Sequence, residues 1–168
     1  EGTLGIVTRL VLRLREMPRS TQTALVGCTT FSDVTSLLKH MDASLGGSLS
    51  AFEVMWNEFF RLVTTPPAKG TAPLSQDYPY YVLIESSGGD ETRDQAQFEE
   101  SLGAAIESGL VADAVIATSK AQRDSIWALR DDVLQTGRWG LPITFDISLP
   151  IANMPAYVDQ VRAELRAQ

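Results

Sequence analysis

Cysteine and histidine are almost absent from this sequence. The 168 residues include one cysteine, Cys28, and one histidine, His40. A single cysteine excludes an internal disulfide, and there is no second histidine or cysteine from which a zinc site could be built. Cys28 lies in the apolar stretch 24–29. We therefore expect an inert core thiol there, and we expect His40 to lie on the solvent-facing or boundary side of a helix as a solvated side chain.

Basic residues are also in short supply. There are 14 Lys and Arg residues against 21 Asp and Glu residues, for a net charge of −7. This balance argues against a nucleic-acid partner, because phosphate binding needs a basic footprint. An anionic substrate would need a local basic site, since the overall field repels it. No apolar run approaches membrane-spanning length, which predicts no membrane span and leaves the cytoplasm as the expected location.

Apolar residues are spaced at strand or helix periods along most of the chain. Strands are predicted over residues 4–14, 23–30, 49–55, 80–85, 112–118 and 143–149. Helices are predicted from Ser32 to Gly46, over residues 57–63, from Asp90 to Gly109, from Ser119 to near Gly137, and from Pro155 onward. Four prolines make residues 64–79 a loop, and its length suggests a mobile or functional segment.

The order of these elements favours an α+β fold. Strand–helix–strand units with short strands indicate a mostly antiparallel sheet covered by helices on one face. The polar residues at 144, 146 and 148 support an uncovered second face. The pattern fits a ferredoxin-like duplicated antiparallel sheet.

The first residues, Glu1-Gly2-Thr3-Leu4-Gly5-Ile6-Val7-Thr8, open in the middle of an element without a Met before them. We therefore expect the chain to be a fragment of a larger protein. The run resembles the closing segment of the flavin-binding domain in FAD-linked oxidases of the vanillyl-alcohol oxidase type. It is most similar to the branch of the D-lactate, glycolate and D-2-hydroxyglutarate dehydrogenases.

A second pair of motifs supports this resemblance. Trp127-Ala128-Leu129-Arg130 is followed by Phe145-Asp146-Ile147-Ser148-Leu149-Pro150. In that branch a Trp-x-x-Arg helix is followed by a strand ending in Asp-x-Ser-Leu-Pro. The motifs lie at both ends of the chain in the family's order, so the resemblance spans nearly all of it, while the middle matches only in pattern.

The resemblance implies a division of the chain. Residues 1–15 would be the end of the FAD-binding domain and the first strand. Residues 16–168 would be a cap, or substrate-binding, domain that is incomplete at its C-terminal end. The family's His-rich metal and acid/base motif would lie beyond the chain, which implies no catalytic residue and no metal ligand in this fragment.

The resemblance also implies a cofactor, FAD, in the full-length parent. Its contacts in this chain would come from Glu1, Gly2, Gly5, Ile6 and Val7, where glycines allow close approach of the backbone. The plain alternative is that these glycines form a turn before a strand and need no ligand.

Arg130 is the sharpest candidate for a substrate-binding residue. Its helical neighbours would be the apolar residues Ile126, Trp127, Val133 and Leu134. A guanidinium in such a setting needs a partner. The residues alone favour snorkelling, or an ion pair with Asp131, Asp132 or Asp146. The resemblance implies instead that this Arg binds the substrate carboxylate, for which its planar fork is suited.

Two positions depart from the hydroxyglutarate pattern. That pattern has a Thr one turn after the Arg, where this chain has Leu134, and a Lys where this chain has Thr144. Fewer donors would hold a second carboxylate less tightly. We therefore expect a monocarboxylate or a more apolar hydroxy acid, with Thr144 bordering the Arg130 pocket.

Two functions from different classes remain. The first is the substrate-binding cap of an FAD-dependent dehydrogenase that oxidises a D-2-hydroxy acid to the 2-oxo acid. Its partners would be a small 2-hydroxy acid and its own flavin-binding domain, with a homodimer left open, and the isolated fragment would be inert. The alternative is a free-standing ferredoxin-like module that binds a small ligand or regulates another protein. A flavin-domain reading frame running into Glu1 would support the first.

Overall fold

The computed structural model describes residues 3–14, 16–142, 144 and 147–167. No helix in this part of the chain is long and apolar enough to cross a membrane. The elements are β1 (Ser20–Cys28), α1 (Phe31–Ser44), β2 (Leu49–Trp56), α2 (Asn57–Thr64), β3 (Tyr80–Gly88), α3 (Glu91–Glu107), β4 (Asp113–Ile116), α4 (Lys120–Asp131), the 3₁₀ segments η1 (Val133–Trp139) and η2 (Ile151–Asn153), and α5 (Met154–Arg166).

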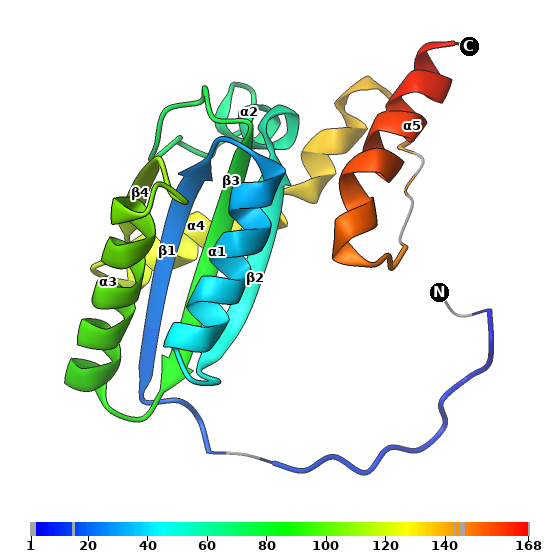
Figure 1. Ribbon diagram of the computed structural model, residues 1–168. Helices are drawn as coiled ribbons and strands as arrows, with labels where there is room; N and C mark the ends of the chain where they lie inside the picture. Colours follow the sequence, from blue (N-terminus) through cyan, green and yellow to red (C-terminus); the bar gives the residue numbers. More distant parts are fainter. Residues whose placement is uncertain (1–2, 15, 143, 145–146, 168) are drawn as a thin grey trace.

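The four strands form one antiparallel sheet in the order β2-β3-β1-β4 (Figure 1). The units β1-α1-β2 and β3-α3-β4 are two strand–helix–strand halves whose first strands pair at the centre of the sheet. Leu25 of β1 lies opposite Leu83 of β3 in this central pair. The predicted α+β class with a ferredoxin-like antiparallel sheet is confirmed.

The helices α1 and α3 cover one face of the sheet (Figure 1). Their buried apolar residues recur every three or four positions, which places them on one side of each helix. This layer consists mainly of Val34, Leu37 and Met41 of α1, Phe98, Leu102 and Ala105 of α3, and Ala24, Val26, Val82 and Ile84 of the central strands.

The shorter helix α2 and the helix α4 cover part of the opposite face, which the sequence had suggested was open. Phe60 and Val63 of α2 pack there with Ile126 and Leu129 of α4. They bury Leu25, Met55, Tyr81 and Leu83 of the sheet. Burial on both faces explains why the β3 sequence is a continuous apolar run from Tyr80 to Ile84 instead of an alternating one.

Local side-chain bonds fix the helix starts. Thr30, and not Ser32 as predicted, caps α1 in a capping box: it accepts a hydrogen bond from the Asp33 N–H, and the Asp33 carboxylate accepts one from the Thr30 N–H at 2.9 Å. The hydrogen bond from the Thr30 side chain is the largest of the effects that lower the pKa of Asp33. Ser119 caps α4 as predicted, accepting a bond from the Gln122 N–H.

Three predicted elements differ in the structure. Residues 4–14 form no strand, and Leu4 and Val11 are fully exposed. Residues 144 and 147–149 form no strand either, while 143, 145 and 146 lie outside the described residues. The fourth helix ends at Asp131, short of Gly137. The two missing strands differ because a strand needs a neighbouring backbone with which to form hydrogen bonds. The helix α4 ends early because the carboxylates of Asp131 and Asp132 are unfavourable at the negative end of the helix dipole.

The loop between α2 and β3 is tied to the domain at several points. Asn57 donates hydrogen bonds to the carbonyls of Gln76 and Tyr78, both at 2.7 Å. The buried Tyr81 hydroxyl donates to the Ser75 carbonyl at 2.6 Å. At Gly70 a Cβ atom would overlap the Val63 carbonyl, so only glycine lets the loop approach this closely.

Candidate functional site

Two carboxylates lie on the face of the sheet that α2 and α4 cover only in part. Glu85 of β3 pairs with Thr23 of β1 on one side and with Ala51 of β2 on the other. Glu53 is two residues beyond Ala51 on β2, so its side chain points to the same face. The two glutamates are therefore diagonal neighbours on adjacent strands, about 7–8 Å apart.

Helix α4 contacts both carboxylates. Trp127 Nε1 donates a hydrogen bond to Glu85 Oε2 at 2.7 Å, and Arg130 Nε donates one to Glu53 Oε2 at 2.9 Å. Residues three apart share one side of a helix, and here each of the two bonds one of the diagonal glutamates. Thr23 Oγ1 donates to the same Glu85 oxygen at 2.9 Å. We refer to Trp127, Arg130, Glu53 and Glu85 as the α4 clamp.

The guanidinium of Arg130 is paired twice. Besides Glu53, its Nη1 donates to Asp131 Oδ1 at 3.1 Å. These two hydrogen bonds, that of Glu53 first, raise the pKa of Arg130 above its ordinary value. The side chains of Arg130 and Glu53 are 41% and 37% exposed, so water screens the pair. The site is thus a partly open surface with one cation and three carboxylates, those of Glu53, Glu85 and Asp131.

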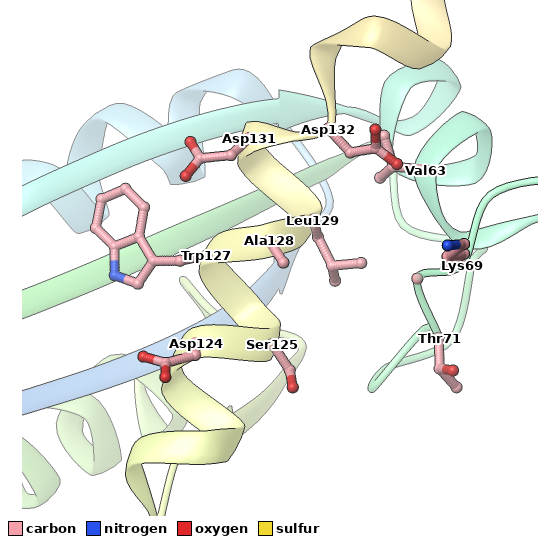
Figure 2. Close-up of a pocket in the computed structure, with 11 residues that line it drawn as sticks. Val63, Lys69, Thr71, Asp124, Ser125, Trp127, Ala128, Leu129, Asp131 and Asp132 are labelled. Atoms are coloured by element: carbon pink, nitrogen blue, oxygen red, sulfur yellow. The ribbon is translucent and has the colours of Figure 1, made fainter.

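A cavity of about 760 Å³ adjoins the clamp. Its walls come from α4 and from residues 69–71 of the loop, and they include Trp127, Ala128 and Asp131. Figure 2 shows the side chains of Trp127 and Asp131 on one side of α4, while Leu129 points toward the loop. Arg130 is not one of the residues that line this cavity, so the guanidinium faces the sheet instead.

The structure confirms part of the prediction for Arg130. Its ion pair with Asp131 is one of the pairs that the sequence suggested. Asp132 instead accepts a hydrogen bond from Gln135 at 2.8 Å, and Asp146 lies outside the described residues. The pair with Glu53 was missed. Its signal was a charged residue on a strand face otherwise formed by Ala51 and Met55.

The remaining predicted neighbours of Arg130 lie beyond α4. Val133 and Leu134 belong to η1, and Leu134 is 86% exposed. The prediction that they flank Arg130 on one helix is therefore wrong. Thr144 is described and exposed, but the structure gives no contact between it and Arg130. Its place beside the Arg130 pocket stays a prediction.

The structure describes three of the five predicted flavin contacts, Gly5, Ile6 and Val7. Glu1 and Gly2 lie outside the described residues. Gly5 has open space around it, and Ile6 and Val7 are largely exposed. The role of these residues as flavin contacts therefore stays a prediction.

The two scarce residue types lie on the α1/α3 side. Cys28 is fully buried, and this burial, followed by the charge of Asp33, raises the pKa of its thiol from 9.0 to about 12. The inert core thiol agrees with this environment. His40 lies at the boundary of α1, half-buried, as one of the two predicted placements had it. Its side chain is not simply solvated, because its Nε2 lies 2.8 Å from the Ser101 carbonyl and links α1 to α3. Because a carbonyl only accepts, Nε2 carries the proton.

The chain is similar in sequence to a domain family and to several known dehydrogenases. Residues 17–168 match the family described as "FAD linked oxidases, C-terminal domain". The mitochondrial D-2-hydroxyglutarate dehydrogenases of Arabidopsis thaliana and Rattus norvegicus are each 33% identical over 166 residues. D-2-hydroxyglutarate dehydrogenase of Xanthomonas citri pv. viticola is 32% identical over 165 residues. These alignments cover 98% of the chain but only 30%, 31% and 34% of the three relatives.

Proposed function

Since the chain belongs to the family of C-terminal domains of FAD linked oxidases, we propose that it is the substrate-binding domain of an FAD-dependent dehydrogenase. The reaction would be the oxidation of a D-2-hydroxy acid to the 2-oxo acid. Relatives named D-2-hydroxyglutarate dehydrogenase support this class. The chain spans about a third of their length. FAD, held by the flavin-binding part of the parent, would take up the two electrons.

The observation that supports this proposal most directly is the placement of Arg130. Its guanidinium is anchored from one side by Glu53 and remains 41% exposed. Among the described residues, its Nη2 atom has no hydrogen-bond partner. A planar guanidinium with free N–H groups suits a carboxylate, because two parallel bonds fix the orientation of the anion as well as holding it. The role of Arg130 would be to position the hydroxyl-bearing carbon for oxidation.

The proposed substrate is a monocarboxylate or a more apolar hydroxy acid. Leu134 and Thr144 stand where the hydroxyglutarate pattern has a hydroxyl and an ammonium group, so donors for a second carboxylate are missing from these positions. Thr144 would border the substrate and contribute a single hydroxyl. In the full-length enzyme, Thr144→Lys should therefore raise the efficiency for dicarboxylates relative to monocarboxylates. An unchanged ratio would remove Thr144 from the proposed pocket.

Replacement of Arg130 in the full-length enzyme tests the central assignment. A charge-assisted bond contributes roughly 1.5–3 kcal/mol, so Arg130→Met should lower kcat/KM for hydroxy acids by about 10- to 100-fold. Arg123→Met removes the same charge from the same helix, outside the α4 clamp, and should leave kcat/KM near that of the parent. Both variants should retain their flavin absorbance. Normal turnover by a folded, FAD-loaded Arg130→Met would show that Arg130 serves only the clamp.

The isolated chain should be inactive and colourless. Gly5 has open space around it, Ile6 and Val7 are largely exposed, and the remaining flavin contacts would come from the rest of the parent. The absorbance spectrum of the purified 168-residue chain, after incubation with FAD and gel filtration, measures this directly. A yellow preparation with stoichiometric flavin would contradict the proposal.

A further inference from the structure

We propose that Glu53 is a positioning residue for Arg130 that also selects against substrates with a second carboxylate. This inference deepens the proposed function and rests on Arg130 binding the substrate. Glu53 lies on β2, 77 positions along the chain from Arg130, and contacts it at 2.9 Å. Neither the family motif around Arg130 nor the residues near it in sequence include this glutamate.

A count of the donors shows how Glu53 leaves room for a substrate. A guanidinium has five N–H donors. Glu53 accepts from Nε, and Asp131 accepts one bond from Nη1. Among the described residues, three donors then have no partner, one on Nη1 and two on Nη2. A substrate carboxylate can therefore bind these donors while Glu53 holds the base of the guanidinium in a fixed plane.

The charges around Arg130 set the selectivity. A first substrate carboxylate is compensated by its direct bonds to the guanidinium. A second carboxylate would meet the field of Glu53, Glu85 and Asp131, which together outweigh the one cation. Asp131 is 61% exposed at the end of α4, where water screens its charge. Glu53 and Glu85 are fixed by the sheet. Of these two glutamates, Glu53 is the one that bonds Arg130, so its charge is the more tightly linked to the site.

The clamp separates the two glutamates by role. Glu85 accepts hydrogen bonds from Trp127 and Thr23 and holds α4 on the sheet. Glu53 bonds only Arg130 among the described side chains, in a pair that is more than a third exposed. An exposed ion pair adds little to stability. Loss of the Glu53 charge should therefore alter substrate choice more than folding.

The test compares Glu53→Gln with the parent in the full-length enzyme. Glutamine can still accept the Arg130 Nε–H bond, so the change removes mainly the charge. We expect kcat/KM for a D-2-hydroxy dicarboxylate to rise roughly two- to fivefold relative to a monocarboxylate of equal chain length, which is the range for an exposed charge pair. The change should fall on KM, with kcat nearly constant. Glu99→Gln on α3, on the other face of the sheet, should leave the ratio unchanged.

Salt supplies a second measurement that needs no variant. Because exposed charges are screened beyond about 10 Å at 0.1 M ionic strength and about 3 Å at 1 M, the discrimination of the parent enzyme should weaken as salt is raised. Glu53→Asp, which keeps the charge, should retain the parent's ratio. The inference is overturned by an unchanged ratio in Glu53→Gln, by an equal shift in Glu99→Gln, or by a salt-independent ratio. If Arg130→Met turns over normally, the substrate-binding role of Arg130 fails and this inference fails with it; if only the ratio fails to move, the role of Arg130 stands.

Discussion

Residues 20–131 and the segments on either side of them have similar apolar periodicity but opposite burial. In residues 20–131, which we call the sheet domain, Leu25 and Leu83 are fully buried. In the segment before it, Leu10 and Leu12 alternate just as regularly and are 72% and 75% exposed. Figure 1 shows that N-terminal segment leaving the sheet as an extended strip. Alternating apolar residues show that a segment can bury one face as a strand, but they do not provide the element that would pack against that face.

The C-terminal segment gives the same lesson for helices. In α5, Val158 and Val161 recur at helical spacing, yet the helix has no buried residue. Its side-chain link to the sheet domain is an exposed ion pair between Arg162 and Glu58 at 2.8 Å. By contrast, α1 and α3 together bury six apolar residues against the strands. The stability of a helix in a protein comes more from its tertiary contacts than from its intrinsic helix propensity.

Thiol reactivity should separate the two regions most strongly. At pH 8, a pKa of about 12 leaves about one Cys28 thiol in 10⁴ ionised, while an exposed thiol with a pKa near 9.0 has about one in ten. We expect Ellman's reagent to label Cys28 in the native chain at least about a thousandfold more slowly than a cysteine introduced by Leu12→Cys in a Cys28→Ala background. Comparable rates would mean that β1 is accessible.

The same raised pKa predicts how stability depends on pH. The folded state keeps the Cys28 proton at pH values where the unfolded thiol has lost it. The contribution is therefore present in full below pH 9.0 and is lost as the pH rises toward about 12. Unfolding titrations of the parent and of Cys28→Ala across this interval should diverge at high pH, with the parent losing stability faster.

Leucine truncation should give the next largest contrast. Leu83→Ala, at a fully buried position of the central strand β3, should lower the free energy of unfolding by about 3 kcal/mol through lost burial and a residual cavity. Leu12→Ala removes the same atoms from an exposed position and should change it by less than about 0.5 kcal/mol. Urea unfolding of the 168-residue chain measures both. A costly Leu12→Ala would show that the N-terminal segment packs in solution.

The sheet domain could be predicted from sequence because its signals are local. The β2 and α2 boundaries follow from the apolar spacing and agree with the structure to within one residue. Ser119 and Gly109 mark the start of α4 and the end of α3 as predicted. The capping box at Thr30 was missed because Ser32 is also a good capping residue, and only the backbone conformation decides between two such residues so close together.

The pairing of the site could not be predicted in the same way. Trp127 and Arg130 were recognised because they match the Trp-x-x-Arg motif of the family that the chain resembles and because Arg130 has apolar neighbours in the sequence. Their partners Glu85 and Glu53 are 42 and 77 positions away, and the sheet register decides which carboxylates meet α4. Likewise, the helix α2 covers the second sheet face through Phe60 and Val63, a contact that no local pattern specifies.

The tryptophan of the clamp gives a smaller and more specific contrast. Trp127→Phe keeps an aromatic ring but removes the N–H group that donates a hydrogen bond to Glu85 at 2.7 Å. Bonds to charged groups contribute roughly 1.5–3 kcal/mol, and the partial exposure of the site places the expected loss near the lower end. Trp139→Phe in η1, at an 82% exposed ring, should cost less than about 0.5 kcal/mol. Equal effects in urea unfolding would argue that the Glu85 bond does not hold α4.

Helix caps should give the smallest contrast between the two regions. Thr30 caps α1 with a reciprocal pair of bonds, whereas Asn153, which precedes α5, makes no side-chain capping bond. Thr30→Ala should therefore lower the free energy of unfolding by about 1 kcal/mol, and Asn153→Ala should change it by no more than a few tenths. Thr30→Ser keeps the acceptor oxygen and should recover most of the loss. If Asn153→Ala proved as costly as Thr30→Ala, α5 would be stabilised in solution by a capping bond that its exposed position does not suggest. The C-terminal segment would then resemble residues 20–131 in its stability, and the contrast in burial would not extend to it.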